Sequence, residues 1–231
     1  MKKTYAILFA VVLVLSLSAL IFADKVKEDS TELMFERVIK FSSEENAPDV
    51  VCTGAGVRKK FVVKVYGAAV YIEPEAAKKI LAKHMPAKPP EDIEDFVEDL
   101  AENEAYWKDF INGSFHKVIV MRFVRDVGAD SIIGAYRDGF EENLEDKSDL
   151  TKKAVKKFLS FFTDEIKENQ DMTLRFAPDG TIIVDYAGKN RGSVKSLPVA
   201  RSLLKNWFGD DPISDDIKEY GMKFIYEIIK K

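Results

Sequence analysis

Gly54-Ala-Gly-Val-Arg-Lys-Lys-Phe-Val-Val-Lys-Val-Tyr-Gly-Ala-Ala-Val-Tyr-Ile72 is the stretch of sequence that decides the fold. Its valines and aromatic residues favour a β-sheet. Arg58 stands at one end of this apolar run, and Gly67-Ala-Ala69 forms a patch of small residues. Because small side chains leave room that large ones would fill, the patch predicts a pocket beside the sheet. The residues alone leave three partners open for Arg58: solvent, a carboxylate of the protein, or a ligand.

The chain begins with a segment typical of exported proteins. Lys2 and Lys3 precede an uncharged run from Tyr5 to Ala23, and charged residues resume at Asp24. This is the layout of a secretory signal peptide, with cleavage after residue 23. A run of this length could also nearly span a bilayer, so an uncleaved anchor is the alternative. In either case we expect a bacterial protein whose body is exported, either periplasmic or secreted.

Length and charge restrict the remaining part, residues 24–231, to a few classes of protein. Removal of residues 1–23 takes away two lysines and no acidic residue, which leaves 33 basic against 39 acidic residues, a net charge of −6. A chain of this size fits one domain with a substantial core. The acidic balance argues against nucleic acid as a partner, because that role needs a clustered basic face. We expect contact with a membrane only through an uncleaved N-terminal segment.

The residues that usually hold metals or act as nucleophiles are scarce. Cys52 is the only cysteine, so no internal disulfide can form. His84 and His116 lie far apart in sequence and do not have metal-ligand spacing. A nucleophilic pair of Cys52 with one histidine is possible, but a buried free cysteine is far commoner. No phosphate-binding glycine loop is present. We therefore predict neither a metal nor a cofactor.

Patterns of apolar residues and chain breakers predict the order of the elements. Strands are expected at 33–41, 49–53, 61–72, 116–124, 172–176 and 181–186. Helices are expected at 75–84, 91–100, 129–144, 150–168, 197–208 and 214–230. The turn Pro178-Asp-Gly180 joins two of the strands into a hairpin. Antiparallel strands with helices between and after them predict an α+β fold, in which one open-faced antiparallel sheet is packed against a layer of helices.

Four segments of the chain resemble segments of the chalcone isomerase family and follow one another in the same order as in that family. The first is the quoted stretch 54–72, which is similar to the signature strand pair of that family. Arg125-Asp126 then leads into a helix that ends near Phe140, and the hairpin at 178–180 follows. The segment 197–209, with Pro212-Ile-Ser214 after it, is similar to the closing helices. The resemblance covers most of residues 33–228 and marks 86–112 as an insertion.

The resemblance implies two different chemistries. In the plant enzymes an arginine at the position of Arg58 binds the phenolate of a chalcone while the ring closes to a flavanone. A guanidinium suits this task because it stays charged and offers fixed donors to an oxyanion. This chain departs from the enzymes elsewhere: Tyr66 replaces a threonine, and Ser131 and Ala135 stand where a lysine and an asparagine are expected. Asn206 keeps the polar residue of the closing helix.

The fatty-acid-binding branch of the family has the same arginine and a tyrosine, and here Arg58 and Tyr66 match them. We therefore predict a domain that binds a hydrophobic or planar acid, with Lys64 and Asn206 as further ligand-binding residues. Lys64 is included because alternation along a strand puts it on the face of Tyr66. The first alternative is an intramolecular lyase (isomerase) acting on an enone-like substrate, with Arg58, Tyr66 and Asn206 as catalytic residues. The second is a non-catalytic envelope protein. Tyr136 and Trp207 are predicted to pack in the core.

Overall fold

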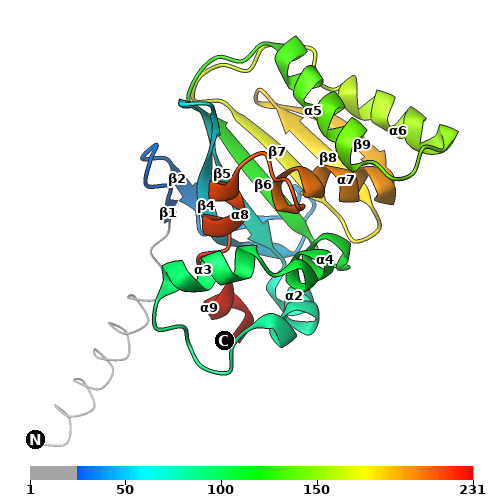
Figure 1. The fold of residues 1–231 in the computed structure, drawn as a ribbon. Helices are drawn as coiled ribbons and strands as arrows, with labels where there is room; N and C mark the ends of the chain where they lie inside the picture. Colours follow the sequence, from blue (N-terminus) through cyan, green and yellow to red (C-terminus); the bar gives the residue numbers. More distant parts are fainter. Residues whose placement is uncertain (1–24, 231) are drawn as a thin grey trace, which may run out of the picture.

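Seven strands form one antiparallel sheet that supports the rest of the molecule (Figure 1). The computed structural model describes residues 25–230, so the predicted signal peptide or anchor at 1–23 lies outside the described residues. The order across the sheet is β3-β4-β5-β6-β7-β8-β9, and each neighbouring pair is antiparallel. The strands are β3 (Val38–Lys40), β4 (Asp49–Lys60), β5 (Val63–Ile72), β6 (Lys117–Phe123), β7 (Asp171–Phe176), β8 (Thr181–Tyr186) and β9 (Lys189–Lys195).

Helices cover one face of this sheet. They are α2 (Pro74–Leu81) with the 3-10 turn η1 (Ala82–His84), α3 (Ile93–Ala101), α4 (Glu104–Asn112), α5 (Ala129–Asn143), α6 (Asp149–Leu159), α7 (Leu197–Phe208), α8 (Asp215–Tyr220) and α9 (Ile225–Lys230). In α3 the predicted apolar stripe of Phe96, Val97 and Leu100 is buried, and the Asp92 carboxylate accepts hydrogen bonds from the first backbone amides. The arrangement confirms the predicted α+β fold class.

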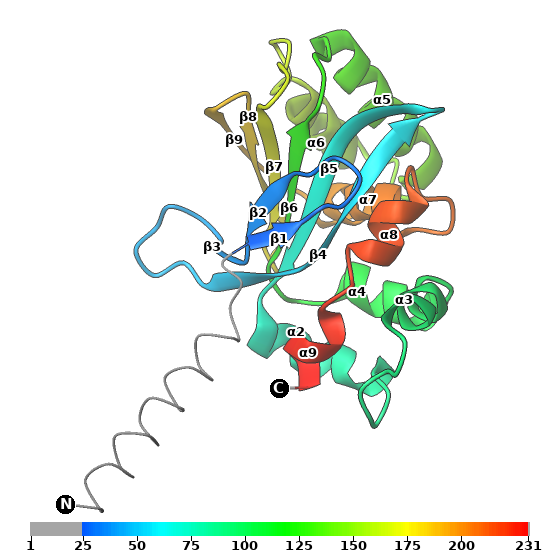
Figure 2. The ribbon, with the colours of Figure 1, turned by 90° about the vertical axis from the view of Figure 1, so that its left-hand side faces the viewer.

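A short hairpin covers part of the opposite face. It consists of β1 (Lys25–Lys27) and β2 (Met34–Glu36), which lie in front of the sheet in Figure 2 while α5, α6 and α7 lie behind it. Val26 and Phe35 of this hairpin are buried against Ala69 and Tyr71 of β5. A Cβ on Gly67 would lie 2.8 Å from a side-chain carbon of Leu33 in the same hairpin loop. The small patch at 67–69 therefore makes room for the β1–β2 hairpin, which occupies the space in which the sequence predicts a pocket.

The glycines of β4 have a packing role as well. A Cβ on Gly54 would lie 2.0 Å from the backbone oxygen of Tyr220, and one on Gly56 would lie 2.3 Å from that of Asp216. Only glycine lets α8 approach the strand this closely. The Asp216 carboxylate in turn accepts a hydrogen bond of 2.6 Å from the amide of Val57. Helix α8 thus covers the edge of β4 beyond the part paired with β3 and provides an acceptor for the amide next to Arg58.

Several predicted boundaries differ from the structure. The strand predicted at 33–41 is interrupted at Arg37, and the ones at 49–53 and 61–72 belong to a hairpin in which β4 continues to Lys60. The helix predicted at 150–168 ends at Leu159, because Ile166 forms a β-bridge with Val127 instead. The helix predicted at 214–230 is interrupted, since the Gly221 carbonyl accepts a hydrogen bond of 2.6 Å from the Thr53 hydroxyl. The edge strand β9 was not predicted.

No helix within residues 25–230 has both the length and the apolar character needed to cross a membrane.

Candidate functional site

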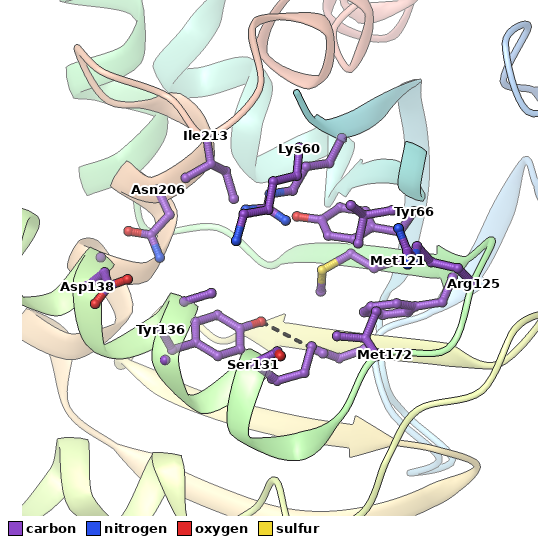
Figure 3. A pocket seen from close by; sticks show the side chains of 18 of the residues that line it. Lys60, Tyr66, Met121, Arg125, Ser131, Tyr136, Asp138, Met172, Asn206 and Ile213 are labelled. Carbon is purple, nitrogen blue, oxygen red and sulfur yellow. Dashed lines mark hydrogen bonds between the residues drawn. The ribbon is translucent and has the colours of Figure 1, made fainter. Parts of the chain in front are cut away.

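A cavity of about 840 Å³ lies between the sheet and the helices α5 and α7 (Figure 3). Its sheet wall follows the register of the strands: Arg58 of β4 pairs with Tyr66 of β5, which pairs with Phe123 of β6. In a neighbouring row, Met121 of β6 pairs with Met172 of β7. The sheet wall is largely apolar at these positions, and charged and polar side chains line other parts of the cavity. A mainly apolar cavity with some polar groups is the usual form of a small-molecule site.

Arg58 lines the cavity and is half-buried. Its guanidinium carbon lies 5.8 Å from the centre of the Tyr66 ring. Its Nε atom is buried and has no hydrogen-bond partner within residues 25–230, and no carboxylate in that range lies within ion-pair distance of its side chain. A buried donor without a partner is uncommon in folded proteins, because its desolvation is not compensated. Of the three partners left open by the sequence, a carboxylate of the described chain is therefore excluded.

Tyr66 presents its hydroxyl beside this arginine. The side chain is 5% exposed, and its oxygen accepts a hydrogen bond of 3.1 Å from Nε1 of Trp207. Burial raises the pKa of Tyr66, although the charge of Arg58 and the bond from Trp207 act in the opposite direction. The hydroxyl is therefore protonated at neutral pH. Since its oxygen already accepts a bond, its hydrogen remains as a donor. Trp207, predicted only as a core residue, lines the cavity and orients this hydroxyl.

Asn206 lines another part of the same cavity. It is 3% exposed, and its Oδ1 accepts a hydrogen bond of 3.0 Å from the amide of Asn143. The amide packs directly on α5, where a Cβ on Gly139 would lie 2.5 Å from that oxygen. Figure 3 shows its nitrogen pointing toward the cavity, near Asp138. Asn206 can thus donate a hydrogen bond to a ligand. Figure 3 shows it on the side of the cavity opposite Arg125.

Lys64 does not line the cavity, contrary to the prediction. The register places Arg58 opposite Tyr66 and Lys59 opposite Lys64, so Val65 is an extra residue without a partner on β4. Such a β-bulge interrupts the alternation of side chains. Val65 and Tyr66 consequently both line the cavity, and the ammonium group of Lys64 turns to the other face, where it donates to the Ser30 carbonyl.

Charged residues that the sequence analysis did not select give the cavity an electrostatic asymmetry. Lys60 and Arg125 line it together with Arg58, and Asp126 beside Arg125 also lines it but is ion-paired with Lys167. Asp138 and Glu142 of α5 contribute negative charge. Figure 3 shows Arg125 on one side of the cavity and Asp138 on the other. An anionic group is therefore favoured on the arginine side and repelled on the α5 side. The i, i+4 spacing of Asp138 and Glu142 on α5 could have indicated a shared face for these two, but only the fold shows that they face one space with Lys60 and Arg125.

Helix α5 supplies another part of the cavity wall. Ser131 and Ala135, at the positions expected for the enzymes' lysine and asparagine, line the wall on α5. Tyr136 lines it too and is held by its hydroxyl, which donates to the sulfur of Met172 at 3.1 Å. Burial raises the pKa of Tyr136 well above its usual range. Tyr136 is thus a fixed, neutral part of the wall, in keeping with its predicted packing role.

Cys52 and the histidines lie outside this cavity. The Cys52 thiol donates to the Gly54 carbonyl at 3.4 Å, and burial raises its pKa to about 12. His84 and His116 each contact a carboxylate, of Asp109 and Glu73 respectively. A nucleophilic pair of Cys52 with a histidine is thus not formed. Among residues 25–230 no group of three or more metal-binding side chains is assembled.

Comparison with known proteins assigns the family. The family model described as "Chalcone isomerase-like" matches residues 100–220, more than half of the chain. The chain belongs to the chalcone isomerase-like family. The resemblance inferred from the sequence is thereby confirmed.

Two curated relatives of this chalcone isomerase-like protein come from Arabidopsis thaliana. Fatty-acid-binding protein 2 is 26% identical over 217 residues, which is 88% of this chain and 52% of the relative. Fatty-acid-binding protein 1 is 27% identical over 177 residues, which is 72% of this chain and 60% of the relative. The chain therefore spans only about half to three fifths of the length of these proteins.

The crystal structure of an Arabidopsis thaliana fatty-acid-binding protein, AtFAP1, has the same fold. It superposes with a TM-score of 0.70 at 21% identity, covering 90% of this chain and all of that one. At this identity the similarity shows the fold alone. The chalcone isomerase-like α+β fold is thus confirmed by an independent structure.

Proposed function

We propose that this protein binds a fatty-acid-like, hydrophobic or planar acid in the cavity, with Arg58 and Tyr66 holding the acid group. The observation that carries the proposal is the Arg58 guanidinium, which has no carboxylate partner within residues 25–230 and lies near a tyrosine whose hydroxyl hydrogen is free to donate. A carboxylate can accept from both groups. Such charge-assisted hydrogen bonds are among the stronger polar contacts that proteins make.

The rest of the cavity supports an apolar ligand body. Beyond Arg58 the wall consists largely of methionine, aliphatic and aromatic side chains, among them Met121, Ile132 and Met172. Its volume of about 840 Å³ lies within the usual range for small-molecule sites. The acidic residues on α5 direct the anionic end toward Arg58. Two relatives named as fatty-acid-binding proteins are consistent with this ligand class.

The isomerase alternative has less support from the cavity. It needs donors that stabilise a developing enolate and a group that supplies a proton. The two aligned α5 positions are occupied by Ser131 and Ala135 in place of the lysine and asparagine of the plant enzymes. Incubation with naringenin chalcone tests this alternative: we expect its visible absorbance to decay no faster than the spontaneous rate.

The binding proposal is tested by titrating the delipidated protein with a fluorescent fatty acid such as cis-parinaric acid. Arg58→Met keeps the apolar stem of the side chain but removes the guanidinium. We expect roughly 10- to 100-fold weaker binding, since a hydrogen bond to a charged group contributes about 1.5–3 kcal/mol. Lys64→Gln is the matched control. It removes a cation from the same hairpin but outside the cavity and should bind like the wild type. Equal affinity of Arg58→Met and wild type would exclude the proposed role.

A further inference from the structure

The tip of the β4–β5 hairpin exposes two large apolar side chains. Phe61 and Val62 are 92% and 91% exposed, and they occupy the two turn positions between Lys60 and Val63. Figure 2 shows the joined ends of β4 and β5 at the margin of the molecule. Apolar side chains this exposed at a turn are not explained by the fold, because they bury nothing in it.

The chemistry of this turn is also unusual. Phe61 has a φ of +56°, a left-handed conformation that is strained for a bulky side chain. Two-residue hairpin turns normally place Gly, Asn or Asp at such positions. The sequence Phe-Val therefore goes against local turn preference. Its presence indicates that the two side chains serve contacts outside the chain.

Lysines surround the two apolar residues. Lys59 and Lys64 face each other across the hairpin, and Lys60 directly precedes the turn. Like charges directly opposite each other destabilise a strand pair. Within residues 25–230 no carboxylate forms an ion pair with any of the three. This basic cluster, on a chain with a net charge of −4, is therefore available to an external anionic partner.

We propose that the hairpin tip, residues 59–64, docks on the surface of an anionic lipid bilayer. Phe61 and Val62 enter the boundary between headgroups and acyl chains, while the lysines contact lipid phosphates. A combination of inserted apolar residues and a basic patch is what reversible membrane attachment requires. This contact would be separate from the N-terminal anchor, which the sequence predicts only as the alternative to a cleaved signal peptide.

The position of the tip relative to the cavity supports a lipid partner rather than another protein. Lys60, Phe61 and Val63 belong both to the tip and to the cavity lining. Docking would therefore bring this side of the cavity close to the bilayer, where acids with long apolar chains partition. A second copy of the chain is a poorer partner for the same patch, since two lysine-flanked tips repel each other in a symmetric contact.

The test uses a local probe on the full chain, because residues 5–23 could bind vesicles on their own. Val62→Cys is labelled with an environment-sensitive fluorophore; the buried Cys52 stays unlabelled. Leu150→Cys, at an equally apolar position that is 79% exposed on α6, is the control. We expect a blue shift at position 62 with vesicles of phosphatidylcholine and phosphatidylglycerol, weakened by salt, and none at position 150. No shift at position 62, or an equal shift at both positions, would overturn the proposal.

Charge variants of the labelled protein separate the lipid from other partners. Lys59→Glu should weaken vesicle binding about five-fold or more, given a contribution of about 1 kcal/mol per lysine near an anionic surface. Lys153→Glu on α6 changes the net charge equally and should bind like its parent. A shift that needs no vesicles and grows with protein concentration would instead show self-association and refute lipid docking.

The outcome is independent of the proposed ligand. Val62 and Lys59 do not line the cavity, so Val62→Ser and Lys59→Glu should leave the affinity for soluble fatty acid unchanged while they weaken vesicle binding. Loss of fatty-acid binding in Arg58→Met with normal vesicle docking would support both proposals. An absence of fatty-acid binding in the wild type would refute the proposed function without affecting the docking test.

Discussion

The hydroxyl of Tyr66 combines a structural and a binding role, and Tyr66→Phe separates the two. The substitution removes one oxygen and its hydrogen and leaves the ring, which contacts Phe123 at a centroid distance of 5.3 Å, in place. The oxygen accepts from the indole nitrogen of Trp207 at 3.1 Å in a buried environment. In the variant this indole N–H is buried without an acceptor.

The expected magnitudes follow from these contacts. A buried donor left without its partner costs about 1–3 kcal/mol, so the free energy of unfolding should fall by that amount. Loss of a single donor to the ligand carboxylate should weaken binding by roughly 5- to 30-fold, which corresponds to about 1–2 kcal/mol. Urea unfolding of the delipidated protein measures the first quantity, and titration with cis-parinaric acid measures the second.

Tyr71→Phe provides the control on the same strand. The hydroxyl of Tyr71 donates to the carbonyl of Glu36 at 2.9 Å, on the face covered by the β1–β2 hairpin. Its removal also leaves a polar group without its partner, so stability should fall by a similar amount, while the affinity for the fatty acid should not change. The reasoning is refuted if the two variants bind equally well, or if Tyr66→Phe unfolds at the same urea concentration as wild type.

Three further predictions concern other sites. Gly139→Ala would bring a methyl group within 2.5 Å of the Asn206 amide and should lower the free energy of unfolding by about 1–3 kcal/mol in urea. Gly134→Ala, where nothing lies within 4 Å, should be neutral or stabilising. Burial lowers the pKa of Lys117 to about 7. Between this value and its ordinary pKa of about 10.4, the unfolded chain binds more protons than the folded chain. The free energy of unfolding should therefore rise with pH, by at most about 1.4 kcal/mol per pH unit. Lys117→Met should lack this rise. The Cys52 thiol, with a pKa raised to about 12, should react with a disulfide reagent only after denaturation; rapid labelling of the native protein would contradict its burial.

Elements with a strong local pattern could be predicted from the sequence. Most of the run predicted at 61–72 forms strand β5, which begins at Val63, and the stripe of α3 is buried as its spacing indicates. Elements that depend on contacts between residues distant in sequence could not be predicted in this way. The edge strand β9 is polar and largely exposed, so no alternation marks it. The break at Gly221 comes from a bond to Thr53, which is distant in sequence.

The candidate site could be predicted in part for the same reason. Arg58, Tyr66 and Asn206 were selected from the family resemblance, and the structure places all three in one cavity. Trp207 was assigned only to packing, because no sequence signal links its indole to a hydroxyl 141 positions away. Whether these residues bind a ligand remains a prediction for the Arg58→Met and Tyr66→Phe experiments.

The bulge at Val65 explains both the error at Lys64 and the organisation of the hairpin. One unpaired residue reverses the alternation, so that Val65 and Tyr66 line the cavity and Lys64 joins Lys59 outside it. Without the bulge Lys64 would face the cavity as Tyr66 does, instead of pairing with Lys59 on the other face. The bulge thus leaves Arg58 facing the cavity, where it can bind a carboxylate, and Lys59 and Lys64 outside it, where they can contact a lipid surface. Binding and docking are therefore distinct properties of one hairpin, and single substitutions on either side of Val65 should alter one without the other.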